Sequence, residues 1–306
     1  MLTQQQKDDR RNYIGGSDVA AICGVSPYKT IYQLWLEKTG RVVEQDISHK
    51  NYIKFGNYFE KGIAHWFCDE TKKQVKPNYS QNFIIHPTIP YLAGNIDFFI
   101  GDENSILECK TALNTNEWGD EQNIIPMHYL CQVAHYCMIG NFDKAYIAVV
   151  FAAKRELKYY TYNRLPELEV KLLDKIQHFW LNNVLEDIAP EPTNVDDLML
   201  MYKESNNKPI VATDPIEVII GALKMINKDI KAKEERKEEL KNEICLYMKD
   251  HDTLLDINGK SLATWKFTRP IKRFDTKKLE QENKNIYDKY VTECDPQRRF
   301  LIKDEK

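Results

Sequence analysis

The sequence predicts an α/β fold in which helices flank a mixed central sheet, followed by a smaller C-terminal α+β appendage. Apolar strand-like stretches alternate with amphipathic helical stretches in the first part of the chain. The turn-forming stretch GDEN lies between two of these strand-like runs, as expected for a hairpin. The polar stretch APEPTN (189–194) then gives the best domain boundary. We therefore expect domains at residues 1–190 and 191–306.

The N-terminal stretch IGGSDVAAICGVSPYKTIYQLWLEKTG predicts two helices separated by a turn. Ser17 is placed to cap the first helix and Thr30 the second, which ends at Gly40. A third helix is expected over 54–73. Its apolar residues recur at helical spacing and predict one inward face, with Glu60 beside it: Phe59, Ile63, Trp66 and Phe67.

The middle of the chain predicts the strands of the central sheet. Three strand-like runs form a meander, followed by a helix at 127–139, two more strands within 144–164 and an amphipathic helix at 165–188. The meander runs are NFIIHP, YLAGNIDFFI and SILECKTA.

The C-terminal domain is predicted to begin with a long charged helix at 215–249, paired in a helical hairpin with 195–204. Its mixed charges are typical of a solvated face or an antiparallel helical pair. Asn258-Gly259 predicts a type I′ hairpin turn, and a helix near 276–291 and a strand at 298–303 follow. The stretch TWKFTRPIKRFDTKK interleaves aromatic and basic residues, which suits either nucleic-acid contact or a basic outer face of a β-module.

Composition narrows the class of protein. With 42% hydrophobic and 29% charged residues the chain has the composition of a folded domain. No apolar run reaches membrane-spanning length, and the N-terminus lacks a signal-peptide core. The seven cysteines form no CxxC pair, which favours free thiols in a reducing compartment, so we expect a cytoplasmic protein. The net charge of −3 neither indicates nor excludes a nucleic-acid partner.

Acidic and basic side chains meet at one edge of the predicted sheet. Glu108 and Lys110 are two residues apart on a strand, so both leave the same face, and Asp97 lies on the partner strand of the hairpin. Grouping buried carboxylates is costly unless a cation neutralises them. Hard oxygen ligands suit Mg²⁺ or Mn²⁺. A lysine beside such a site can orient or deprotonate the attacking water, or stabilise developing negative charge.

These motifs resemble those of the PD-(D/E)xK nucleases, which implies a restriction-endonuclease-like core. GNYFE (56–60), GNID (94–97), ECK (108–110) and QVAHY (132–136) follow the order of the RecB-like branch. The N-terminal stretch and IIPMHYLCQVAHYCMIGNFDKAYIAVV are similar to the lambda-exonuclease/YqaJ-type phage recombination nucleases. The resemblance covers roughly residues 10–190, and the ordered set is more specific than any single motif.

The resemblance implies a role for each matching residue. Asp97, Glu108 and the backbone carbonyl of Cys109 would hold the principal metal, and Glu60 would support a second. Lys110 would position the attacking hydroxide. Gln132 would steady Lys110 or the substrate phosphate, with Tyr136 packing behind it. Ser17, with Arg10 or Arg11, would take the 5′-terminal phosphate, a role that a hydroxyl-capped helix N-terminus also suits.

The resemblance also implies an activity and partners. Members digest one strand of linear duplex DNA from an end, 5′ to 3′ and processively, for recombination by single-strand annealing. It implies a Mg²⁺ cofactor, a trimeric ring around the DNA, a RecT/Bet-like annealing protein as partner, and a phage or prophage origin. Related iron–sulfur nucleases carry a C-terminal cysteine cluster that this chain lacks, so we expect no iron–sulfur cluster.

Other interpretations stay open. Asp97 would instead cap a turn, Glu60 would be a solvated helix residue, and Ser17 would be only an N-cap. An endonuclease or repair nuclease on the same fold is one alternative function. A catalytically silent DNA-binding or assembly protein is another, against which the intact Asp97, Glu108 and Lys110 argue.

Overall fold

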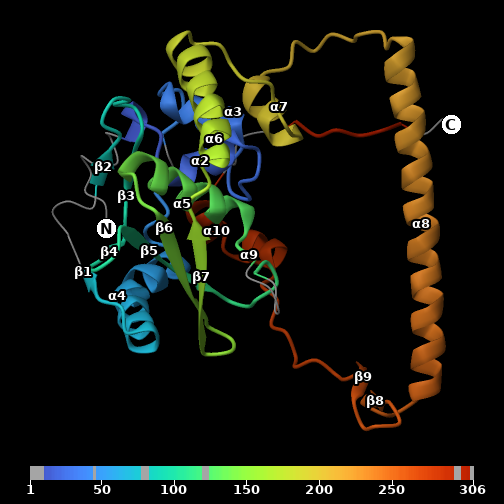
Figure 1. Ribbon diagram of the computed structural model, residues 1–306. Coiled ribbons are helices and arrows are strands. Elements are labelled where there is room, and N and C mark those ends of the chain that lie inside the picture. The colour runs from blue at the N-terminus through green and yellow to red at the C-terminus, as the bar shows by residue number, and fades with distance from the viewer. Residues whose placement is uncertain (1–9, 44–45, 77–82, 119–123, 293–297, 304–306) are drawn as a thin grey trace. The chain divides into compact units, whose positions relative to one another are not determined.

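The computed structural model describes residues 10–43, 46–76, 83–118, 124–292 and 298–303 (Figure 1). The chain divides into two compact units, which meet in sequence at Lys203 and Glu204. The first unit contains the predicted central sheet and its helices, and the second begins with the long helix. Each unit is described separately below.

A mixed five-stranded sheet with the order β1-β4-β5-β6-β7 lies at the centre of the first unit. Neighbouring strands are antiparallel, except that β5 and β6 run parallel. A two-stranded antiparallel sheet of β2 and β3 lies in the same unit. The mixed α/β class predicted from the sequence is confirmed. The strands are β1 (Val75–Lys76), β2 (Phe83–Ile85), β3 (Ala93–Asn95), β4 (Phe98–Ile100), β5 (Ser105–Ala112), β6 (Lys144–Phe151) and β7 (Glu156–Asn163).

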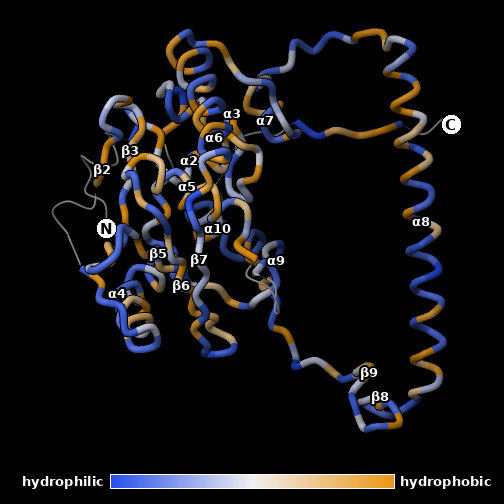
Figure 2. Tube along the Cα trace, viewed as in Figure 1, coloured by the Kyte–Doolittle hydropathy of each residue, from blue (hydrophilic) through white to orange (hydrophobic). Residues whose placement is uncertain are grey.

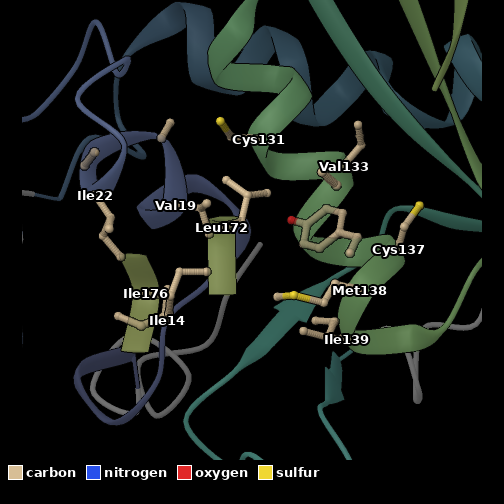
Figure 3. Packing of buried hydrophobic residues seen from close by; sticks show 14 of the residues in the cluster. Ile14, Val19, Ile22, Cys131, Val133, Cys137, Met138, Ile139, Leu172 and Ile176 are labelled. Carbon is tan, nitrogen blue, oxygen red and sulfur yellow. The ribbon is translucent and has the colours of Figure 1, made fainter. Parts of the chain in front are cut away.

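Helices cover both faces of this sheet because the buried strand β6 alternates its side chains between two cores. Ile147 and Val149 join the core formed with the helices α2, α3, α5 and α6, whereas Tyr146 and Ala148 pack with α4. Figure 3 shows residues of α5 and α6 within the larger core, together with Val19 and Ile22 of α2. These helices are α2 (Gly16–Ile22), α3 (Ile31–Lys38), α4 (Asn51–Thr71), α5 (Met127–Gly140) and α6 (Pro166–His178).

The apolar stretch predicted as one strand at 91–100 divides into two. β3 pairs with β2, whereas β4 pairs with β5 in the central sheet. Ile96 and Asp97 make the step between them, so Asp97 lies immediately before β4 rather than within a continuous strand. The hairpin of β4 and β5 forms as predicted, with Phe98 opposite Leu107.

The N-terminal helices differ in how they begin. α2 has Gly15 as its N-cap, so the prediction that Ser17 caps this helix is wrong. Thr30 caps α3 as predicted: its hydroxyl accepts a hydrogen bond from Gln33 N at 3.1 Å, and the Gln33 side chain accepts one from Thr30 N. A short 3₁₀ turn, η1 (Arg10–Asn12), precedes α2.

A buried ion pair joins these N-terminal elements. Lys38 Nζ lies 2.7 Å from Asp18 Oδ2 and also donates to the carbonyl oxygens of Arg10 and Tyr13, each at 2.6 Å. All three ammonium donors therefore have partners. Burial alone would raise the pKa of Asp18, but the charges of Lys38, Arg10 and Lys29, together with the hydrogen bond from Lys38, lower this pKa to about 2. Lys38 thus holds the turn carrying Arg10 against α2.

Helix α4 buries less of its apolar face than the sequence predicted. Ile63 and Phe67 are fully buried against the sheet, whereas Phe59 and Trp66 are exposed. The buried face of α4 is therefore narrower than predicted: it consists of Ile63, Ala64 and Phe67, and it does not include the two exposed aromatic residues.

The first unit extends beyond the boundary that the sequence predicted at 190. A π-helical turn, η2 (Phe179–Leu185), continues α6, and α7 (Val195–Met201) follows. Asp197 of α7 accepts a hydrogen bond from Thr30 Oγ1 at 2.7 Å and from Thr193 N at 2.9 Å. Because Asp197 is hydrogen-bonded to Thr30 at the start of α3, α7 belongs to the first unit, whereas the sequence placed it in the C-terminal domain.

The second unit begins with the 35-residue helix α8 (Asp214–Met248), close to the predicted bounds. The hairpin of β8 (Thr253–Leu255) and β9 (Ser261–Thr264) follows. Its turn is not type I′, because only Gly259 has a positive φ and Gly259 N donates to Asp256 O. The single helix expected near 276–291 is broken at Asn283 into α9 (Thr276–Glu282) and α10 (Lys284–Tyr290), and residues 298–303 form no strand.

Two further observations concern the chain as a whole. The cysteines within the described residues are free thiols, as predicted, while Cys294 lies outside those residues. None of the helices in the described ranges combines the length and apolar composition that a membrane crossing requires.

We predict that Lys38→Met destabilises the first unit by about 3–5 kcal/mol, because the buried Asp18 carboxylate loses the cation that hydrogen-bonds to it. Lys29→Met is the matched control. It breaks the half-exposed pair with Glu37 and should cost no more than about 1 kcal/mol. Urea unfolding followed by tryptophan fluorescence measures both changes. Equal losses in the two variants would contradict a structural role for the buried pair.

Candidate active site

Glu108 is the centre of the candidate site. It lies on β5 with only 3% of its surface exposed. Its Oε1 accepts hydrogen bonds from Lys110 Nζ at 2.7 Å and from Gln132 Nε2 at 2.8 Å. Its Oε2 is buried and has no hydrogen-bond partner among the described residues. A buried carboxylate oxygen without a partner is costly, which indicates that a ligand of positive charge belongs there.

Asp97 comes to the same place from the adjacent strand. Its Oδ2 accepts a hydrogen bond from the backbone N–H of Cys109 at 2.8 Å, which fixes the carboxylate against the middle of the ECK motif. Burial raises the pKa of Asp97 well above its usual range, and the charge of Glu108 raises it further. The two carboxylates therefore lie close enough to repel each other.

Glu60 is a half-buried residue of helix α4. Burial raises the pKa of its carboxyl, and the charge of Glu108 is the next cause. Neither burial nor the charge of Glu108 would raise the pKa of a fully solvated helix residue. The raised pKa of Glu60 therefore argues against the alternative that it is only a solvated residue of α4. Gly56, one turn earlier on α4, packs beside Thr111 of β5, since a Cβ at Gly56 would lie 3.7 Å from Thr111 Oγ1.

Lys110 supplies the positive charge nearest to these carboxylates. Burial would lower the pKa of its ammonium, but the charges of Glu108 and Asp97 outweigh burial and raise it. Lys110 is therefore a stable cation in this environment. Its Nζ also lies 5.0 Å from the centre of the Tyr129 ring.

The donor set fits a hard divalent cation. Carboxylate oxygens dominate it, one of them is buried without a partner among the described residues, and burial, followed by the charge of Glu108, raises the pKa of Asp97 and of Glu60. In the described residues, however, no three Asp, Glu, His or Cys side chains stand in a ready metal-binding arrangement. One oxygen of Glu108 is occupied by Lys110 and Gln132, so a cation would meet the other oxygen.

Gln132 and Tyr136 form the wall behind Glu108. Gln132 Nε2 donates to Glu108 and also lies 3.0 Å from the hydroxyl of Tyr136. Gln132 thus contacts Glu108, where the sequence resemblance implied contact with Lys110 or with the phosphate of the substrate. Tyr136 is buried one helical turn after Gln132, as the resemblance implied.

Two glycines pack directly against the Tyr136 ring. A Cβ placed on Gly94 of β3 or on Gly16 of α2 would lie 2.6 Å from Tyr136 Cε1, far inside van der Waals contact. A Cβ on Gly16 would also lie 2.9 Å from Cγ of Gln132. The ring is therefore held between α2 and β3. His135 is buried on the same helix, with Nε2 3.0 Å from the carbonyl oxygen of Ala93.

The candidate phosphate-binding residues lie at the start of α2. Arg10 donates from Nη2 to Ser17 Oγ at 3.3 Å and lies 3.8 Å from Asp18 Oδ1. Ser17 is exposed and directly follows Gly16, the residue whose backbone lies against Gln132. Arg11 points elsewhere: a Cβ on Gly40 would lie 3.4 Å from its Nη1. The structure thus brings Arg10, and not Arg11, to Ser17.

Sequence reasoning missed two features beside the site. Tyr129, whose ring faces Lys110, lies three residues before Gln132 on the same face of α5, and that spacing was the available signal. The other feature is an aromatic face on α4, next to Glu60, where the rings of Phe55 and Phe59 stack at 4.2 Å. The exposed aromatic residues of this face are Tyr52, Phe55, Tyr58 and Phe59. Four aromatic side chains within eight residues were the signal.

Comparison with known proteins identifies the family. The YqaJ-like viral recombinase domain matches residues 6–143. The chain is also 34% identical to the uncharacterized protein YqaJ of Bacillus subtilis (strain 168), over 97% of this chain and 92% of that protein. The chain belongs to the YqaJ family. Its N-terminal segment, the α4 helix, the β3–β5 region and α5 all fall within the matched domain.

Solved structures of low sequence identity are also similar to this member of the YqaJ family. The alkaline exonuclease LHK-Exo of Laribacter hongkongensis is 16% identical, with a TM-score of 0.48 over 61% of this chain and 94% of that chain. A phage related exonuclease from Haemophilus somnus 129PT is 12% identical, with a TM-score of 0.42 over 63% of this chain and 96% of that chain.

We predict that Gly94→Ala destabilises the first unit by about 1–3 kcal/mol, because the added methyl group overlaps the Tyr136 ring. The ring cannot move away from the methyl group, since Gly16 of α2 also packs closely against it. Gly62→Ala is the control, because no atom lies within 4 Å of a Cβ at this helical position. It should stabilise α4 by about 0.5–1 kcal/mol. Urea unfolding measures both. A Gly94→Ala variant as stable as the wild type would show that the ring is not held tightly.

Proposed function

We propose that this YqaJ-family protein is a Mg²⁺-dependent exonuclease that degrades one strand of linear duplex DNA from its 5′ end during phage-type recombination. The observation that carries the proposal is the buried Glu108 carboxylate, of which one oxygen accepts a hydrogen bond from Lys110 and the other has no partner among the described residues. Asp97 is held by the backbone N–H of Cys109, next to Glu108 in the chain, and burial, followed by the charge of Glu108, raises the pKa of both Asp97 and Glu60. Membership in a family named for viral recombination supports the biological setting.

The proposed metal ligands are Asp97, Glu108, the backbone carbonyl of Cys109 and Glu60. A divalent cation held there would act as a Lewis acid on the phosphodiester and the attacking water. Mn²⁺ is the expected substitute for Mg²⁺, because both accept oxygen ligands.

The side chains of the protein would position the reactants. Lys110 would orient the attacking water and offset the negative charge that develops on the phosphate, since its ammonium is fixed beside Glu108. Gln132 would hold the Glu108 carboxylate in place, and Tyr136, fixed between Gly16 and Gly94, would hold Gln132. Gln132 and Tyr136 are positioning residues in this proposal.

The proposed contact for the 5′-terminal phosphate is the Arg10–Ser17 pair. A guanidinium and a hydroxyl at 3.3 Å offer charge-assisted hydrogen bonds to a phosphate. The short path from Ser17 through Gly16 to Gln132 would join end recognition to the cleavage site. The exposed aromatic face of α4 suits stacking with bases unpaired near the end.

Assembly and partners complete the proposal. A ring of three subunits would let an acidic chain hold DNA by enclosure, with less need for a large basic surface. The exposed strand would pass to a RecT/Bet-like single-strand annealing protein, in the cytoplasm of a bacterial host that carries the phage or prophage.

We predict that Lys110→Ala slows DNA digestion by roughly 10²–10³-fold, because the developing charge loses its nearest cation. The assay uses linear duplex DNA labelled at the 5′ or the 3′ end, with Mg²⁺ or Mn²⁺. Nucleotides should be released from the 5′ end first, and chelation of the metal should stop release. Lys154→Ala is the control for removal of a lysine distant from Glu108. Equal rates for Lys110→Ala and wild type would refute the assigned site, and release from the 3′ end would refute the polarity.

The same assay separates the alternative functions. Closed circular duplex should survive, whereas an endonuclease or repair nuclease would cut it. DNA binding without metal-dependent cleavage would identify a catalytically silent protein.

We predict that Arg10→Ala and Ser17→Ala each reduce the preference for a 5′-phosphorylated end over a 5′-hydroxyl end by roughly 10–100-fold, the value of a lost charge-assisted hydrogen bond. Arg11→Ala is the matched control and should keep the preference. Initial rates on the two kinds of end give the ratio for each variant. Loss of preference in Arg11→Ala alone would move the phosphate site to the other arginine.

A further inference from the structure

Helix α8 of the second unit carries its apolar side chains outward along its length. Every residue from Asp214 to Tyr247 is exposed or half-buried, and burial begins only at Met248. Figure 2 shows hydrophobic positions recurring along the helix between hydrophilic ones. A helix in water gains most of its stability by packing an apolar face, so a helix with this surface requires a partner.

The apolar residues of α8 follow a heptad repeat. Starting at Ile216, apolar side chains recur at alternating intervals of three and four residues through five heptads, interrupted by two lysines. We call this set the seam: Ile216, Ile219, Leu223, Ile226, Ile230, Lys233, Lys237, Leu240, Ile244 and Tyr247. Seven of its apolar members are between 43% and 77% exposed, and Leu223 is half-buried. Alternation of three and four is the pattern of a helix in a two-stranded coiled coil.

Charge excludes a parallel pairing of two copies of α8. In register, Lys233 and Lys237 would each face their own counterpart across the seam. On the flanks, Asp229 would face Glu234 of the partner subunit, and Arg236 would face Lys241 of the partner subunit. All four contacts join like charges. The two lysine contacts lie in the seam between the helices, and each of the two flank contacts occurs twice, once on either side of the seam.

An antiparallel pairing of the same two helices reverses this outcome. When Ile216 is level with Tyr247 of the partner subunit, the same alignment places Leu223 level with Leu240 and both seam lysines opposite isoleucines. The lysine stems then pack on apolar surface while their ammonium groups reach water. On the flanks Asp229 meets Arg236 of the partner subunit, twice by symmetry. Among the described residues, Arg236 forms an ion pair with the exposed Glu239 of its own helix, an interaction that is easily exchanged.

We propose that α8 is a self-association element that forms an antiparallel two-stranded coiled coil with α8 of a second copy of this chain. The seam supplies the apolar contact, the two lysines near its middle limit the pairing to one register, and the Asp229–Arg236 pairs set the direction. This proposal stands on the second unit alone and does not depend on the nuclease proposal.

The first experiment measures the mass of the full-length protein by sedimentation velocity and light scattering. Ile226→Glu places a charge in the seam. If the α8 pair joins two of the assemblies that the first unit forms, this variant should have half the wild-type mass. Met225→Glu is the matched control: it makes the same change at the adjacent residue, which is 70% exposed and outside the seam, and should keep the wild-type mass. Far-UV circular dichroism checks that both variants keep their helices.

The second experiment tests the direction of the pair. Asp229→Arg should raise the dissociation constant roughly tenfold, because two attractive contacts become repulsive. Arg236→Asp should do the same, and the two substitutions in one chain should restore wild-type association. Tighter association of Asp229→Arg alone would indicate contact with Glu234 in a parallel pair and overturn the proposed direction.

Two further outcomes would overturn self-association itself. One is a wild-type mass for Ile226→Glu, which would mean that α8 meets its own chain or another protein. The other is an equal loss of mass in Met225→Glu and Ile226→Glu, which would show that the seam is wrongly assigned.

Discussion

The burial of the Glu108 carboxylate is the constraint on which the rest of the first unit depends. A carboxylate removed from water at the edge of a sheet is stable only when other groups neutralise and orient it. Lys110 does so from the same strand face, and Gln132 does so from the helix packed over it. The second oxygen is buried and has no hydrogen-bond partner among the described residues, and in the proposed function it is the oxygen that would meet a cation.

The precision of this arrangement comes from backbone contacts away from the carboxylates. Gly16 and Gly94 let α2 and β3 approach the Tyr136 ring, and that ring fixes Gln132. Lys38 fixes the turn that carries Arg10 by binding two of its carbonyl oxygens and Asp18. End recognition and cleavage, as proposed, would therefore share a single rigid element, the start of α2.

The two units differ in how far they bury their apolar side chains. The first unit encloses two cores, one on each face of its sheet, whereas α8 of the second unit exposes its apolar residues. A fold that buries its own side chains suits a site needing fixed geometry. A helix that leaves them uncovered suits assembly, because its free energy is gained only when another surface covers it.

The sequence by itself predicted which side chains form the candidate site. Strand periodicity put Glu108 and Lys110 on one face, and the hairpin brought Asp97 beside them. The family resemblance implied Tyr136 behind Gln132. Tertiary structure decided the features that depend on contacts between distant segments. Gln132 binds Glu108, Arg10 contacts Ser17, and α7 is attached to the start of α3. Phe59 faces outward for the same reason. Ser17 was mistaken for a cap because Gly15, which has no side chain, begins the helix. Local periodicity fixes the direction of a side chain along its own element, but its partner is chosen by packing across the fold, which no local pattern encodes.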